Sequence, residues 1–399
     1  MPTDEAAAGV TSFDVAATPR ARRTGATERQ LRVLFFNEGN LGNHVLGHNR
    51  LEHALNTGLK GMKGVEARFA GLSPMQRLAN AAATRPIEPL RRAGLDMQTL
   101  RWHLVQSLRA RGELAQALQS WPADVVHLYT PAVALALGST VRGVPIVLSM
   151  DTTVHEWWAM PAWRPRQRYA PATIAPSRAL ERRALARAAL VLARTRWVRE
   201  SVEREAPGVR VIEHHPGIDL ARYQPAPRRE RTLPRVLFVG GRFAEKGGED
   251  LLAALGEDLG RTVELDLVTP ADIPTRPGMR IHRLNPSDPQ LLDLQQQADI
   301  FCLPTHGDTN PWAIVEAMAC GTPVISTSVG GIPDLLDDGR AGVLVPHGNR
   351  AALREALLAL LADDDRRSRL GVAARQRCDL HYDAKLQVPQ LIEHLRSVV

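Results

Sequence analysis

Short apolar runs recur along most of the chain, with turns rich in glycine, proline and polar residues between them. Runs of this length suit strands that are buried on both faces, as in a parallel sheet. Longer stretches with helical spacing of apolar residues separate many of these runs, which favours alternating strands and helices. The predicted strands are Leu31–Phe36, Val65–Ala70, Asp124–Tyr129, Pro145–Ser149, Leu190–Ala193, Val209–Ile212, Val236–Val239, Val263–Val268, Met279–Leu284, Ile300–Leu303, Val324–Ser326 and Ala341–Val345.

The pattern divides into two units. A chain of 399 residues is long enough for two domains with separate cores. Residues 220–234 are rich in Pro and Arg and are typical of a linker. We predict an α/β fold of two doubly wound parallel sheets. The expected parts are a disordered tail over residues 1–30, a first domain over 31–219, the linker over 220–234, a second domain over 235–380 and a closing helix over 381–399.

Residues 299–334 carry the most specific signal in the chain. A buried strand is followed by a polar loop and by an apolar helix, and Asn310 and Pro311 favour the start of that helix. Glu316 lies in the helix, where an unpaired carboxylate is costly. It is either hydrogen-bonded within the protein or holds a polar ligand, such as sugar hydroxyls, at the carboxyl edge of the sheet. Asp308 lies in the loop at the helix N-terminus, an end that favours phosphate.

This stretch resembles the donor site of the retaining glycosyltransferases of family 4, which have the GT-B fold. That family has two acidic residues separated by seven others, followed by Ala-Met-Ala-x-Gly-x-Pro-Val. Here Asp308 and Glu316 have that spacing, and Ala-Met-Ala-Cys-Gly-Thr-Pro-Val follows. Two residues depart from the pattern, because Asp308 stands where Glu is usual and Pro311 where glycine is common. The turn Gly330-Gly331-Ile332-Pro333-Asp334 also resembles the glycine turn that the family places near its acids.

The resemblance implies two Rossmann-like domains that face each other across a cleft, with a closing helix that crosses back to the first domain. It implies that Asp308 contacts the transferred sugar and that Glu316 holds the ribose of a nucleotide-sugar. It further implies that the following residues line the donor: Thr309, Asn310, Pro311 and Trp312.

The second predicted domain opens with a buried strand followed by Gly240 and Gly241, which let the backbone approach a ligand. Arg242 and Lys246 come next, and only four of the fifty basic residues are lysine. An ammonium beside a guanidinium suits a diphosphate, although an ordinary solvated residue at a helix start is the alternative. In the resembling family a Gly-Arg…Lys-Gly pair holds the donor diphosphate, at a spacing that is often longer than the one here.

The first predicted domain carries weaker signals. Gly39, Asn40 and Gly42 follow the first strand, at the edge where a doubly wound sheet binds ligands, although a plain tight turn fits equally well. The resemblance implies that this loop faces the acceptor and the donor phosphates. Asp151 follows a later strand at about the position where many family members have a histidine that contacts the transferred sugar. His155 lies four residues further on.

Aromatic and basic residues follow this strand. Trp157, Trp158, Trp163 and Tyr169 lie among arginines, which suits sugar stacking, docking at a membrane interface or the packing of a lid helix. Residues 31–215 contain 25 Lys and Arg against 14 Asp and Glu, a balance of +11, whereas residues 231–399 have 18 against 23, a balance of −5. This asymmetry indicates contact with something anionic, such as a membrane surface, or a solvated basic face. No nucleic-acid-binding motif accompanies it.

Apolar runs, cysteines and acidic motifs narrow the expected location of the protein and its need for a metal. No run of 18 apolar residues is present, and the N-terminus lacks the apolar core of a signal peptide. Cys302, Cys320 and Cys378 lack disulfide or metal spacing, so we expect reduced thiols in a cytoplasmic protein that can act peripherally at the inner face of the membrane. No Asp-x-Asp metal motif is visible in the segments that resemble the donor site, so we expect neither metal nor cofactor.

The sequence therefore predicts an enzyme that moves a sugar from an α-linked nucleotide-sugar to a hydroxyl of a glycan, lipid or small molecule. The family implies retention of the anomeric configuration. Arg242, Lys246 and the amides near Asn310 would stabilise the leaving diphosphate by fixed electrostatics. Two alternatives stay open on sequence alone: a GT-B sugar-nucleotide epimerase, and a non-catalytic sugar-nucleotide-binding subunit of a glycan-assembly complex.

Overall fold

The computed structural model describes residues 30–37, 54–55, 57–73, 75, 77–137, 141–160 and 169–399. The predicted tail, apart from residue 30, lies outside the described residues. So do Gly39, Asn40, Gly42 and Trp163.

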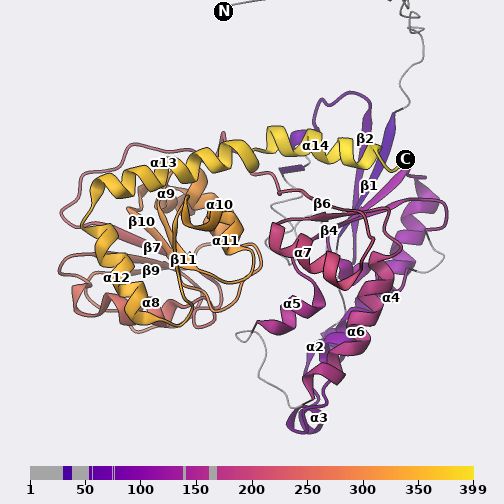
Figure 1. Ribbon diagram of the computed structural model, residues 1–399, viewed down its shortest axis with the longest axis horizontal. Helices are drawn as coiled ribbons and strands as arrows, with labels where there is room; N and C mark the ends of the chain where they lie inside the picture. The colour runs from indigo at the N-terminus through magenta and orange to yellow at the C-terminus, as the bar shows by residue number, and fades with distance from the viewer. Residues whose placement is uncertain are drawn as a thin grey trace, which may run out of the picture.

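The described chain forms two α/β halves (Figure 1). The first half contains β1 (Leu31–Asn37), β2 (Val65–Gly71), α2 (Arg77–Thr84), α3 (Glu88–Arg92), α4 (Gln98–Ser120), β3 (Val125–Leu128), β4 (Ile146–Met150), α5 (Val154–Ala159), α6 (Ala170–Leu185), β5 (Leu190–Ala193), α7 (Arg196–Glu205) and β6 (Val211–Glu213). The second half contains β7 (Arg235–Val239), α8 (Gly248–Leu255), β8 (Glu264–Val268), β9 (Met279–His282), α9 (Pro289–Gln297), β10 (Ile300–Leu303), α10 (Trp312–Ala319), β11 (Val324–Thr327), α11 (Ile332–Leu335), β12 (Val343–Val345), α12 (Arg350–Leu361) and α13 (Asp364–His381). A last helix, α14 (Ala384–Arg396), follows.

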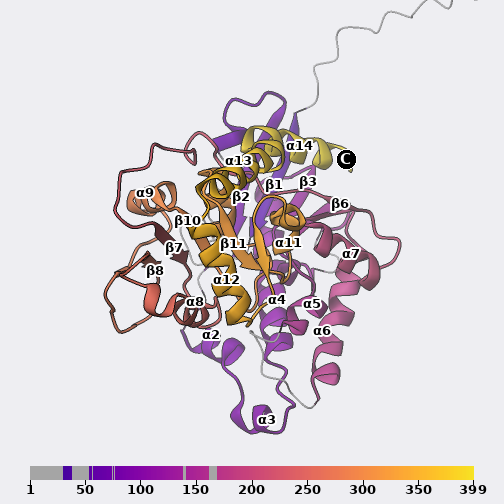
Figure 2. The same cartoon turned by 60° about the vertical axis from the view of Figure 1, so that its left-hand side comes forward.

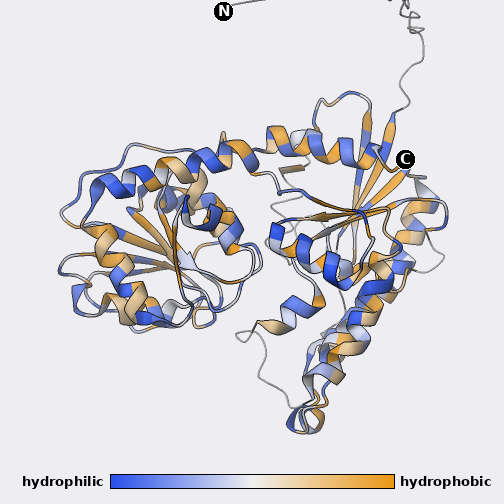
Figure 3. Cartoon of the chain, viewed as in Figure 1, coloured by the Kyte–Doolittle hydropathy of each residue, from blue (hydrophilic) through white to orange (hydrophobic). Residues whose placement is uncertain are grey.

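Each half is built on one parallel sheet. The strand order is β2-β1-β3-β4-β5-β6 in the first half and β12-β11-β10-β7-β8-β9 in the second. All the paired strands run parallel. Helices cover the sheet faces, and the central strands are therefore buried and apolar along most of their length, whereas the edge strands β2, β6 and β9 are partly exposed (Figure 3). The predicted α/β architecture of two doubly wound parallel sheets is confirmed.

The predicted strands are all present among the described residues, and their ends differ from the prediction by at most two residues. Helix α6 starts earlier than its proline would suggest, because it begins at Ala170 and contains Pro176 in its interior. Proline removes one backbone donor from a helix. Packing of α6 against α4 and α5 accompanies the earlier start.

The last helix crosses from the second half back to the first (Figure 1). Val388, Leu391 and Leu395 of α14 pack into one buried cluster with Val33 and Phe35 of β1. A backbone bridge fixes the crossing point, because the Ile218 N–H donates to the carbonyl of Tyr382 over 2.7 Å. The end of the chain is thus part of the core of the first half.

Two sequence expectations concern chemistry outside the site. Cys302, Cys320 and Cys378 are buried free thiols, and burial raises the pKa of each. Over the residues that the structure describes, no helix is long and apolar enough to span a bilayer.

Candidate active site

Lys246 and Asp308 form an ion pair at the carboxyl edge of the second sheet. Lys246 lies after β7 and Asp308 after β10, and these two strands are neighbours in the sheet. The Lys246 ammonium donates to one oxygen of Asp308, and the other oxygen accepts the Thr309 N–H over 2.9 Å. The two side chains are 20% and 11% exposed, so the pair stays accessible. A cation and a carboxylate from two predicted site motifs therefore meet at one point.

The glycines around Lys246 explain how its loop packs. A Cβ on Gly240 would lie 2.8 Å from the ring of Phe238, whereas Gly241 faces open space. Gly247 has a positive φ of 77°, and a Cβ there would overlap the carbonyl of Pro304. Because Gly240 and Gly247 have no Cβ, the Lys246 loop can pack closely against the Phe238 ring and the Pro304 carbonyl.

Arg242 differs from Lys246 in its surroundings. Its side chain is 70% exposed and pairs with Glu245 over 3.0 Å. The Lys246 N–H donates to the Arg242 carbonyl over 2.8 Å, so one tight turn joins the two residues. The structure does not bring the Arg242 guanidinium to Asp308, and its predicted role with the diphosphate stays a prediction.

Asp151 reaches the same region from the first half. It follows β4, and its carboxylate accepts a hydrogen bond from the Thr309 hydroxyl over 3.2 Å. The guanidinium of Arg194, at the end of β5, lies 3.9 Å from Asp151 and is only 6% exposed. Asp151, Thr309 and Asp308 therefore form a connected group between the two halves, as a shared cleft requires.

The start of α10 differs from the sequence prediction. Asn310 was expected to cap the helix, but the N-cap is Pro311 and no side chain caps it. Asn310 is 7% exposed, and its Oδ1 has no hydrogen-bond partner among the residues that the structure describes. The cap prediction was wrong because Pro311 takes an extended conformation one residue later than expected. Trp312 packs against the cores of both halves.

Glu316 has protein partners in a buried position. It is 1% exposed and accepts hydrogen bonds from the Tyr223 hydroxyl over 3.2 Å and from the Gln295 amide over 2.8 Å. This pairing supports the structural interpretation that the sequence left open. The ribose-binding role that the resemblance implies stays a prediction.

Comparison with known protein families shows which kind of enzyme the chain is similar to. A family described as "Glycosyltransferase Family 4" matches residues 62–222, and one described as "Glycosyl transferases group 1" matches residues 233–363. The two matched segments include Asp151, Lys246, Asp308 and Glu316. The chain is a glycosyltransferase.

Named relatives agree with this assignment. The glycosyltransferase is 29% identical over 317 residues to the alpha-maltose-1-phosphate synthase of Mycolicibacterium smegmatis, a match that covers 69% of this chain and 79% of the relative. It is 31% identical over 287 residues to the glycogen synthase of Mycobacterium tuberculosis, which covers 66% of each chain. A shorter match of 31% identity, over 43% of each chain, relates it to a D-inositol 3-phosphate glycosyltransferase of Corynebacterium kroppenstedtii.

Solved structures confirm the GT-B fold of the glycosyltransferase. Sucrose-phosphate synthase from Thermosynechococcus elongatus superposes with a TM-score of 0.70 at 18% identity, over 93% of this chain and 100% of that one. Alr3699/HepE of Anabaena, in a complex with UDP-glucose, gives a TM-score of 0.65 at 16% identity, over 92% of this chain and 100% of that one.

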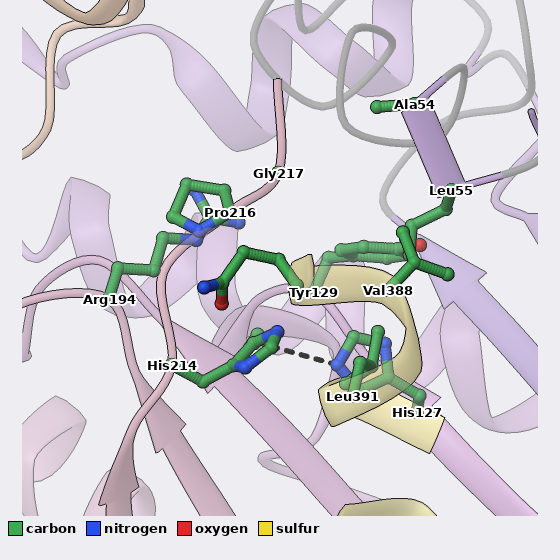
Figure 4. Close-up of a pocket in the computed structure, with 12 residues that line it drawn as sticks. Ala54, Leu55, His127, Tyr129, Arg194, His214, Pro216, Gly217, Val388 and Leu391 are labelled. Atoms are coloured by element: carbon green, nitrogen blue, oxygen red, sulfur yellow. Dashed lines mark hydrogen bonds between the residues drawn. The ribbon is translucent and has the colours of Figure 1, made fainter. Parts of the chain in front are cut away.

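A small cavity lies beside this site in the first half of the glycosyltransferase (Figure 4). It has a volume of about 20 Å³, enough for about one water molecule and too small for a sugar. His127, His214 and Arg194 line it together with residues of α14. His127 contacts Ser149 over 2.8 Å, and burial lowers its pKa to about 3. The cavity is therefore part of the packing under α14.

Other predicted residues of the glycosyltransferase lie nearby. His155 lies on α5, and the hydrogen bonds found among the described residues do not join it to Asp151 or Asp308. Trp157 and Trp158 pack edge to face with ring centroids 6.5 Å apart, which fits the packing interpretation of this aromatic segment. Their predicted role toward an acceptor stays a prediction.

The structure connects three further residues to the site in ways that sequence reasoning did not predict. Arg194 gave no motif signal and is identified by its burial beside Asp151. Gly247 could have been recognised from the Lys-Gly-Gly sequence, which often marks a turn into a helix. Asp334 belongs to the glycine turn that was noted, but its partners lie in the other half and only the fold reveals them.

Proposed function

We propose that this glycosyltransferase moves a sugar from a nucleotide-sugar to an acceptor hydroxyl, with retention at the anomeric carbon and without a metal ion. The observation that carries the proposal is the Lys246–Asp308 pair at the edge of the second sheet, connected through Thr309 to Asp151 of the first half. The structural neighbour with UDP-glucose bound supports a nucleotide-sugar as the donor.

In the proposed reaction the bond between the anomeric carbon and the diphosphate oxygen breaks, and the acceptor oxygen bonds to the same face of that carbon. The acceptor proton passes to the departing diphosphate, so the atoms and charges balance. Lys246 and Arg242 stabilise the negative charge that develops on the diphosphate. The exposed Arg242 can exchange Glu245 for a phosphate, a bidentate partner that suits a guanidinium.

The two acids hold the sugar in this proposal. Asp308 accepts hydrogen bonds from sugar hydroxyls while Lys246 moves from Asp308 toward the diphosphate. Asp151 faces the reacting carbon from the first half, and its negative charge stabilises the positive charge that forms on the sugar. Among the described residues, no group of His, Cys, Asp and Glu is arranged to hold a metal ion. The proposal therefore assigns the charge stabilisation to the chain's own cations.

The acceptor is proposed to be a glycan or a lipid-linked molecule, reached at an anionic membrane surface. Support comes from the arm formed by α2, α3 and α4, which projects from the first half (Figures 1 and 2). We define its tip as residues 85–97. Four large apolar side chains there are exposed, namely Ile87, Leu90, Leu95 and Met97. Arg85, Arg91 and Arg92 are exposed beside them, and this combination suits an anionic bilayer.

Turnover tests the proposed reaction. The enzyme is incubated with UDP-, GDP- or ADP-glucose in the presence of EDTA, and release of the nucleoside diphosphate is measured, with water serving as the acceptor hydroxyl. We expect release from one of the three, and a loss of about 100-fold in Asp308→Asn and in Lys246→Ala, because each removes a charge at the reacting centre. Lys385→Ala is the matched control, since Lys385 is an exposed lysine of α14. Equal rates in Lys246→Ala and Lys385→Ala would contradict the proposal.

A further inference from the structure

Asp334 of the second half binds the N-terminus of a helix in the first half. One of its carboxylate oxygens accepts the Trp197 N–H over 2.8 Å, and the other pairs with the Arg196 guanidinium over 2.8 Å. Trp197 and Arg196 are the first residues of α7, where unpaired N–H groups and the helix dipole favour an anion. Helices α7 and α11 accordingly face each other between the halves in Figure 1.

A second acidic residue strengthens this contact. Arg196 also donates to both oxygens of Asp338 over 3.1 Å. Asp338 and its neighbour Asp337 both have a φ of 52°, in the left-handed region that is costly for residues other than glycine. Asp337 is held there by Arg377 and Arg340 of its own half. The loop is thus fixed in a strained conformation that presents Asp338 to Arg196.

The same segment touches the candidate active site. Gly331 precedes α11, and its N–H donates to the Thr309 carbonyl over 3.0 Å. Gly330 has a φ of 53°, and a Cβ there would overlap the carbonyl of Asp308. The glycine turn therefore lies directly on the loop that carries Asp308 and Thr309, and it continues without a break into Asp334.

Burial distinguishes this contact from an ordinary surface ion pair. Arg196 is 47% exposed and Asp338 is 49% exposed, and a pair of that kind contributes little. Asp334 is only 9% exposed, and both of its oxygens are used by groups of the other half. Loss of Arg196 would leave a nearly buried carboxylate without its ion-pair partner, which is costly.

We propose that Arg196 and Asp334 are positioning residues that form an interdomain clamp. The clamp holds the two halves in the arrangement that places Lys246 and Asp308 of the second half against Asp151 of the first. Its consequence for turnover rests on the proposed function, whereas its consequence for the shape of the protein does not.

Small-angle X-ray scattering of the full chain without ligand tests the clamp. We expect Arg196→Gln and Asp334→Asn each to increase the radius of gyration, because the halves separate when the ion pair is lost. The matched control is Arg199→Gln, one turn along α7, since Arg199 pairs only with Glu203 and Glu213 of its own half among the ion pairs described. The double variant Arg196→Gln/Asp334→Asn should open no further than either single variant. An unchanged radius in both single variants overturns the proposal.

Kinetics with the donor that supports turnover give the second measurement. We expect kcat to fall about tenfold in Arg196→Gln while KM for the donor changes less than about twofold, because the proposed ground-state contacts to the donor, from Lys246, Arg242 and Asp308, all lie in the second half. Arg196→Lys keeps the charge and should recover part of the rate. If Arg196→Gln changed only KM for the donor and left kcat unchanged, the result would count against the clamp. An increased radius in a protein that turns over none of the donors would sustain the clamp and refute the proposed function, so the two failures are distinguishable.

Discussion

His127 shows how a single buried residue sets the pH response of the protein. It is 1% exposed and lies between the rings of Phe35 and Tyr129, at centroid distances of 5.4 and 4.8 Å. Burial lowers its pKa to about 3, and the charge of Arg194 acts in the same direction. In the folded protein the His127 imidazole is therefore neutral at every pH near 7. His214 behaves alike, since burial lowers its pKa to about 3 as well.

Stability should consequently fall in mild acid. The unfolded state binds a proton at His127 near pH 6.5, while the folded state binds it only near pH 3. Full stability is thus present above pH 6.5 and is lost as the pH falls toward 3. Between about pH 7.5 and 5.5, wild type should lose about 1.4 kcal/mol of unfolding free energy more than His127→Gln does. Urea titrations at the two pH values measure this difference. His347→Gln, at an exposed position, serves as the control. If the unfolding free energy of His127→Gln changed with pH as much as that of wild type, the assignment of this pH dependence to His127 would be refuted.

Single residues were predictable from the sequence where a local pattern identified them. Asp308 and Lys246 stand in recognisable motifs, and the structure brings them together although they are 62 residues apart in the chain. Asn310 was misjudged because a capping preference is weak beside the backbone constraint of the next residue, Pro311. The partners of Glu316 could not be predicted, because Tyr223 lies 93 residues away and meets it only in the folded protein.

At the level of elements, buried parallel strands were the easiest to predict. Their continuous apolar runs, such as Ile300–Leu303, are bounded by polar residues and glycine, and both strand ends matched there. Helix starts were harder, since α6 begins before Pro176 and the local sequence argues against a helix there. Tertiary packing against α4 and α5 decides this case.

The tip of the arm, residues 85–97, which includes α3, carries the prediction for membrane contact. Vesicles of phosphatidylglycerol and phosphatidylcholine are floated with the protein at low salt. The double change Leu90→Ser/Leu95→Ser should weaken binding by at least about tenfold, because each leucine contributes about 1.5 kcal/mol or more when buried in the bilayer. Arg91→Gln/Arg92→Gln should weaken it by roughly tenfold or more at low salt, at ~1 kcal/mol for each charge.

The control for this experiment is Leu380→Ser, which removes an apolar side chain that is 69% exposed on α13, in the other half. Full binding by the control, together with loss in the tip variants, would support docking through α3. Docking through the tip would be ruled out if the double leucine variant bound vesicles as well as wild type does, or if wild type did not bind them.

At the scale of the whole molecule, the function depends on two halves that the chain joins more than once. The linker connects β6 to β7, and α14 then returns to the first sheet and buries Leu391 and Leu395 there. The two parallel sheets were predictable from the alternating pattern, and the return of the last helix from the family resemblance, whereas the order of the strands was not predicted. The contacts between the halves were not, because Asp151–Thr309 and Arg196–Asp334 join residues 158 and 138 positions apart without a local signal.

The central claim is that the second half binds a nucleotide-sugar through Lys246. Thermal-shift measurements with UDP, GDP, ADP and their glucose conjugates, in the absence of metal, test it most directly on wild type, Lys246→Ala and Lys385→Ala. A ligand at about 100 times its dissociation constant stabilises a protein by about 2.7 kcal/mol, which raises Tm visibly. We predict that one nucleotide series raises Tm of wild type and of Lys385→Ala, and that Lys246→Ala loses this shift. A chain whose Tm responds to none of these nucleotides, or whose response survives Lys246→Ala unchanged, would contradict the account.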